Sequence, residues 1–190
     1  MLDEPAGPRG RRTAAPLLAL VGALALVAAG CGGKSADQKA NEAYANSVCG
    51  AIAGWETQVK SIATDLSGGI SRASLESKVT QVESATTSLV AQIKAVPPPN
   101  TSAGQATKQQ LDQLSTELTN TVSSPKTAVA GIQANASAAS IGIAVLTLAP
   151  QVKSLATSAQ STISALKSSK GALSSAFKSA SSCKSLGNAG

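Results

Sequence analysis

The 190-residue sequence contains no histidine, and it has only one tryptophan, one tyrosine and one phenylalanine. Histidine is the commonest general base and the commonest metal ligand, so its absence removes the most frequent basis for catalysis or metal binding. The scarcity of aromatic side chains also disfavours a β-sandwich, because β-strands favour aromatic and β-branched residues. We therefore expect a protein that is not an enzyme and that carries no cofactor or metal.

Acidic residues are missing from a long part of the chain. The eight acidic residues after Cys31 all lie at or before Glu117, and six lysines follow Glu117 without any acid. A basic half of this kind can attract an anionic polymer, an anionic lipid or an acidic protein. The alternative is a solvated lysine face that keeps an alanine-rich helix soluble.

The N-terminal region has the order of segments that defines a secretory signal. Three arginines before residue 13 precede an apolar run over 14–29, which is shorter than the roughly 20 residues of a membrane span. The run ends in Ala-Ala-Gly before Cys31, which resembles the lipobox of bacterial lipoproteins. The resemblance implies a signal peptide over 1–30 and a lipid on Cys31. It also implies a location on the extracytoplasmic face of the cell membrane; the alternative is an ordinary secreted protein.

Apolar residues recur at steps of three and four along the remaining chain, which is typical of amphipathic helices. The pattern predicts a helix over 36–66 and a second over 71–96, with Ser71 as its N-cap. Three consecutive prolines end the second helix, and a third begins near Thr101.

No strand pattern is present, so the predicted fold class is all-α, an elongated antiparallel helical bundle. We assign 31–40 to the lipidated cysteine and a tether, 41–185 to the bundle domain, and 186–190 to a frayed tail.

Two cysteines remain after Cys31, and two cysteines in an exported domain usually pair. If Pro125 and Pro150 were both turns, the bundle would have five helices, and Cys183 would lie about 38 Å from Cys49. A disulfide needs Cα atoms within about 7 Å. We therefore expect four helices, with the third running over 101–147 and bent at Pro125.

The predicted disulfide also sets a register between the first and the last helix. If Cys49 faces Cys183, antiparallel helices bring together three pairs of residues from their apolar seams. These pairs are Trp55 with Phe177, Val59 with Leu173, and Leu66 with Leu166.

Residues 135–150 contain no charge, and the predicted hairpin of the third and fourth helices places them at its tip, far from Cys31. Exposed apolar residues there would form a contact surface; the alternative is that they are buried. The candidate contact surface combines apolar residues of the tip with lysines of the acid-free half, namely Ile141, Ile143, Val145, Leu146, Leu148, Lys153, Lys167, Lys170 and Lys178.

These features favour a non-enzymatic binding or scaffold module, anchored by lipid at the bacterial cell envelope. Its partner would be an anionic envelope polymer or a protein, and no nucleic acid. The alternative is a small-molecule carrier or sensor with a ligand cavity inside the bundle. A polar cavity of a few hundred Å³ would favour the carrier, and a solid core would favour the scaffold.

Overall fold

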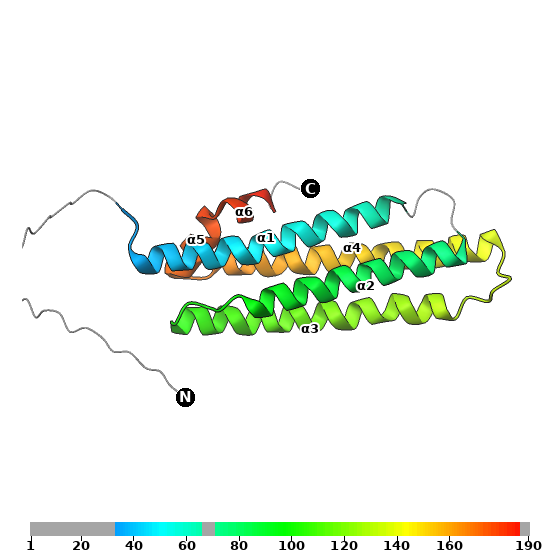
Figure 1. The fold of residues 1–190 in the computed structure, drawn as a ribbon, viewed down its shortest axis with the longest axis horizontal. Coiled ribbons are helices and arrows are strands. Elements are labelled where there is room, and N and C mark those ends of the chain that lie inside the picture. Colours follow the sequence, from blue (N-terminus) through cyan, green and yellow to red (C-terminus); the bar gives the residue numbers. More distant parts are fainter. Residues whose placement is uncertain (1–32, 66–70, 187–190) are drawn as a thin grey trace, which may run out of the picture. The chain divides into compact units, whose positions relative to one another are not determined.

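The computed structural model describes residues 33–65 and 71–186, and a compact unit begins at Lys34. Every regular element in those ranges is a helix, and a disulfide joins Cys49 to Cys183 (Figure 1). The helices are α1 (Ala36–Asp65), α2 (Arg72–Ala95), α3 (Ser102–Ala130), α4 (Ala138–Ser168), α5 (Ala172–Ser179) and α6 (Ser181–Ser185). The all-α fold and the disulfide are therefore confirmed.

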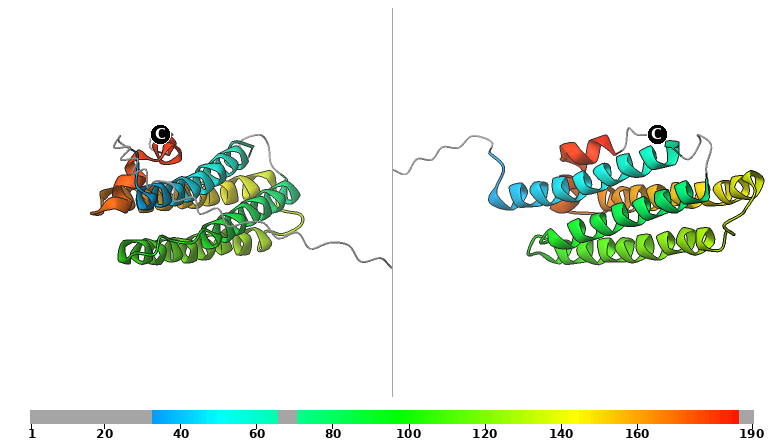
Figure 2. Two further views of the ribbon diagram at one scale, coloured as in Figure 1. Left: turned by 60° about the vertical axis from the view of Figure 1, so that its left-hand side comes forward. Right: turned by 45° about the vertical axis from the view of Figure 1, so that its right-hand side comes forward.

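The four long helices α1 to α4 run side by side with alternating direction (Figures 1 and 2). Each packs against the next along the chain, and α4 also contacts α1. The two short helices pack on α1. The helices, their shared core and the disulfide all belong to the unit that starts at Lys34, so this unit contains the contacts that fold it.

Some predicted boundaries lie outside the described residues. The signal peptide over 1–30 and Cys31 belong to this group, as do residues 187–190 of the predicted tail. Leu186, the first residue of that tail, is buried in the core instead of frayed. The tether is also shorter than 31–40, because α1 begins at Ala36.

Side-chain caps explain where the helices begin. Ser71 accepts a hydrogen bond from the backbone N–H of Ser74, and Thr101 accepts one from Gly104, as N-cap residues do. Both predicted helix starts are thus confirmed. A Cβ at Gly104 would lie 2.0 Å from the carbonyl oxygen of Pro99, so only glycine fits at this start of α3.

The predicted third helix over 101–147 is wrong, because the chain turns at 131–137. Gly131 ends α3, and Ser137 begins α4 by accepting from the N–H of Ser140. Pro125 and Pro150 lie inside α3 and α4, respectively, and neither is a turn. A proline inside a helix removes only one backbone hydrogen bond, so the helix can continue through it. Gly131 ends α3, and the N-cap Ser137 then starts α4, so the chain turns between these two residues.

The sequence predicts one last helix that continues to Cys183, whereas the structure divides this stretch into α4, α5 and α6. Helix α4 ends at Ser168, and Gly171, at a φ of 107°, lets the chain reverse into α5 and α6. Figure 1 shows α6 beside α1, which is how Cys183 reaches Cys49 with a Cα–Cα distance of 5.0 Å.

This reversal overturns the predicted register. Phe177 packs edge-to-face on Tyr44, with ring centroids 6.3 Å apart, while Trp55 bonds to α2. Val59 lines a groove with Val152 and other residues of α4, and Leu173 is not among the residues of that groove. The third pair includes Leu66, which lies outside the described residues.

Candidate contact surface

The apolar residues of the candidate surface divide into two groups. Ile143 is 66% exposed and Leu146 is 77% exposed, and Val145 beside them is half-buried. Ile141 and Leu148 are buried in a second core cluster, so their assignment to the surface is wrong. Residues on the same face of a helix share its environment, and these two lie on the face of α4 that turns inward.

Ile143, Val145 and Leu146, which we call the α4 patch, lie near the start of α4. In Figure 1 this start is at the end of the bundle opposite the start of α1. The predicted position of the uncharged stretch at a hairpin tip is thus correct, although the turn comes earlier in the chain. By length and composition, α4 could also cross a membrane.

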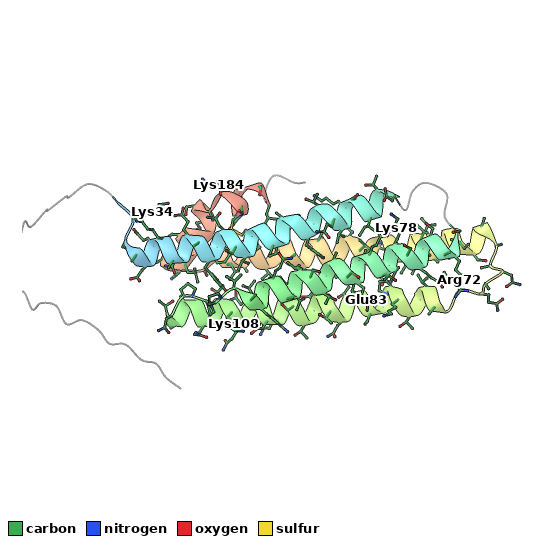
Figure 3. The ribbon with its side chains drawn as sticks, in the orientation of Figure 1. Lys34, Arg72, Lys78, Glu83, Lys108 and Lys184 are labelled. Carbon is green, nitrogen blue, oxygen red and sulfur yellow. A yellow bond between two sulfur atoms is a disulfide. The ribbon has the colours of Figure 1, made fainter. Side chains whose placement is uncertain are left out.

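Two cations of α2 near this end form ion pairs with acids of α1 and α2. Arg72 contacts Glu76 at 2.8 Å, and Lys78 contacts Asp65 at 2.6 Å. Figure 3 shows both cations on α2 near the end where α4 starts. Because they are paired with acids, these charges leave the α4 patch as an uncharged surface.

The four candidate lysines do not form one surface with the α4 patch. Lys167 donates from Nζ to the carbonyl oxygen of Cys183 at 2.7 Å, so it holds α6 in place. Lys170 follows the end of α4 and Lys178 lies on α5, and both are exposed. Lys153 lies at the middle of α4, about two turns beyond Leu146.

The core of the bundle is filled. A small apolar space between the helices has a volume of about 10 Å³, and Ile62, Val122 and Leu148 are among the residues around it. A single water needs at least that much room. This internal space is therefore too small for a small-molecule ligand.

A groove lies on the surface between α1 and α4, and we call it the α1–α4 groove. Its volume is about 330 Å³, and Val59 and Ala63 from α1 face Val145, Ala149, Val152 and Ala156 from α4. This groove was not predicted from the sequence. Its only signal is a row of small apolar residues on α4 at helical spacing, which resembles any packed seam.

Glu56 was also missed. This side chain is only 3% exposed, and its Oε1 has no hydrogen-bond partner in the described structure. Burial raises the pKa of Glu56, although a hydrogen bond with Gln160 and the charge of Lys60 oppose the rise. The signal in the sequence is a lone acid within the apolar seam of α1, next to Trp55.

Tyr44 is the other titratable group with a shifted pKa. Burial, followed by the charge of Asp112, raises the pKa of Tyr44 to about 12, so its hydroxyl stays neutral at ordinary pH.

Across 33–65 and 71–186, no group of three or more aspartate, glutamate or cysteine side chains could hold a metal ion. No known protein family, curated protein or solved structure matches this chain.

Proposed function

We propose that this protein is a lipid-anchored, non-enzymatic binding module of the bacterial cell envelope, and that the α4 patch is its contact surface for a protein partner. The exposure of Ile143 and Leu146 carries the proposal. Burying a large aliphatic side chain stabilises a complex by about 1.5–3 kcal/mol. Two such residues one turn apart therefore provide a compact apolar anchor for a partner.

The proposed anchor and the α4 patch belong at opposite ends of the molecule. Cys31, the proposed lipid site, precedes Lys34 by three residues, and the 30 residues of α1 extend about 45 Å from there. A lipid at Cys31 would hold the start of α1 close to the membrane. The α4 patch would then face away from it.

The filled core supports a binding module more than a carrier with an internal cavity. The dispersed lysines support a protein partner more than an anionic polymer, because a polymer would need a continuous basic surface. Lys167 is also occupied with the carbonyl oxygen of Cys183.

Site-specific photo-crosslinking in the bacterial envelope tests the contact surface. A benzoylphenylalanine at Leu146 of the full chain should give a discrete crosslinked product, and the Ile143→Ser change should weaken it. The same probe at Gln92, exposed on α2, is the matched control. Products that are identical from both positions would contradict the proposed surface.

Fractionation of cells tests the anchor. The full chain should be found with the membrane, and the Cys31→Ser variant should leave the membrane fraction. A variant that stays in the membrane fraction would contradict a lipid anchor at Cys31. Because the two experiments use different residues, one part of the proposal can fail without the other.

A further inference from the structure

The seam between α1 and α4 is covered by another helix at one end and is open at the other. Toward the start of α1, α6 covers it, because Cys183 is bonded to Cys49 of α1 and accepts from Lys167 of α4. Next come the buried Glu56 and the half-buried Gln160, which share a hydrogen bond. Beyond that pair no described element covers the seam, and it opens into the α1–α4 groove.

The lining of the groove is apolar with a basic edge. Both helices contribute only valine and alanine, apart from Lys60 of α1 and Lys153 of α4. Lysine side chains can lie along apolar surface with their stems while the ammonium reaches water. No acidic residue lines the groove, so its charge complements an anion.

The dimensions of the groove decide between a helix and a thinner ligand. From Val145 to Ala156, α4 extends about 16 Å. The volume of about 330 Å³ is the space open to the centre of a water molecule, so over that length it corresponds to a cross-section of about 20 Å² for such centres and to a free width of about 8 Å. Carbon atoms in contact lie about 3.5–4.0 Å apart, so one extended hydrocarbon chain fits. An α-helix, about 10 Å across, is too wide to enter.

A second copy of this chain fits the groove poorly. Two copies related by symmetry would each bring Lys60 and Lys153 to the contact, and the like charges would repel. A partner with an apolar chain and a negative head group meets both the lining and the edge.

We propose that the α1–α4 groove binds the acyl chain of a single-chain anionic amphiphile of the fatty-acid class. The buried Val59 and Val152 form the floor of the groove, its more exposed alanines take the hydrocarbon, and Lys153 pairs with the carboxylate. Lys60 also lies near Glu56, so Lys153 makes the larger contribution. A groove of this volume is at the lower end of the range for ligand sites, as expected for a ligand with one chain.

Isothermal titration calorimetry with dodecanoate, kept below its micelle-forming concentration, tests the proposal. The protein used is the unit from Lys34 onward, which contains all the described helices, the core and the disulfide. We expect one dodecanoate per protein. Dodecanol and dodecyltrimethylammonium, which lack the negative head group, should bind at least tenfold more weakly.

Variants locate the site. Ala149 is exposed, so Ala149→Phe should fill the groove, keep the helical content and weaken dodecanoate binding at least tenfold. Ala91→Phe, at an exposed position of α2, should bind like the unchanged protein. Lys153→Gln should weaken binding about tenfold, whereas Lys94→Gln, exposed on α2, should not.

Four outcomes would overturn the site. The first is the absence of one-to-one binding, and the second is full binding by Ala149→Phe. The third is equal affinity for the cationic amphiphile, and the fourth is binding only to phosphatidylglycerol vesicles, which would indicate a membrane-facing surface. If Ala149→Phe loses helical content, Ala156→Leu provides the same test with a smaller change. Crosslinking at Leu146 is a separate measurement, so its failure and that of the groove are distinguishable.

Discussion

Trp55 donates its indole N–H to the hydroxyl oxygen of Thr86, at 3.1 Å, across the buried interface of α1 and α2. Thr86 occupies a position in the apolar seam of α2 where an aliphatic residue would be expected. The indole N–H is a donor only, and a buried donor without a partner is costly. The hydroxyl at this core position therefore provides the hydrogen-bond acceptor that the single tryptophan of the chain needs.

Replacing Thr86 with valine keeps the shape of the side chain and removes the acceptor. We expect the free energy of unfolding to fall by about 1–3 kcal/mol, because the indole N–H stays buried without a partner. Urea unfolding followed by Trp55 fluorescence measures the change. Thr80→Val, at an exposed position of the same helix, should change stability by less than about 0.5 kcal/mol. Equal stability of Thr86→Val and the unchanged protein would contradict a role for this bond.

Glu56→Gln should stabilise the protein at neutral pH. The amide keeps a hydrogen bond to Gln160 and removes a buried charge, so we expect a gain of about 1 kcal/mol, or about 2–4 °C in melting temperature. Calorimetry at pH 7 measures the gain. Glu76→Gln, which breaks the partly exposed pair with Arg72, should not stabilise the protein.

The advantage of Glu56→Gln should depend on pH. Because burial raises the pKa of Glu56 in the folded state, its contribution to stability is complete below the unfolded pKa and is lost as the pH rises through the folded pKa. The difference in melting temperature between the two proteins should therefore shrink as the pH falls toward about 4. A difference that stays constant from pH 4 to 7 would show that ionisation of Glu56 does not matter.

Loss of the disulfide should have a large effect. The bond closes a loop with a sequence separation of 134 residues, for which the chain-entropy estimate is about 4–5 kcal/mol. Cys183→Ser should lower the melting temperature by about 10 °C or more under oxidising conditions. Reduction of the unchanged protein should have a similar effect, and an unchanged melting temperature in either case would contradict the stabilising role.

Pro150→Ala should stabilise α4. Pro150 is exposed inside the helix, where it lacks the N–H that the helix needs, and proline costs about 3 kcal/mol more than alanine in a helix interior. We expect a gain of about 1–3 kcal/mol in thermal unfolding. Pro125→Ala is the comparison, because Pro125 is buried and its replacement also removes packing. A loss of stability in Pro150→Ala would mean that α4 needs a bend there.

The sequence predicted the bundle well where local chemistry decides the structure. Ser71 and Thr101 cap helices as expected, since an N-cap acts within three residues. The turn at 131–137 was missed because Pro150 is a strong helix breaker by propensity, yet α4 continues through it. Tertiary packing along α4 outweighs that local preference.

The fold-back of α5 and α6 could not be read from periodicity. Apolar spacing continues across Gly171, whereas the extended backbone at Ser169, the positive φ of Gly171 and the non-helical Ala180 redirect the chain. Two apolar residues of the candidate surface, Ile141 and Leu148, are buried for a related reason. The spacing of apolar residues identifies the faces of α4, but the turn before α4 decides which face packs against the other helices. Ile141 was therefore expected on the surface, whereas it is buried.

The bond between Cys49 and Cys183 makes one covalent ring of every residue between them. A protease that cuts once inside this ring opens it without releasing a fragment. The turn over 131–137, whose residues are exposed or half-buried, is such a place. A molecule nicked there would migrate as one species on a non-reducing gel and as two after reduction. If the protein lies in the cell envelope, as proposed, a molecule cut there by a protease would keep both ends of its bundle.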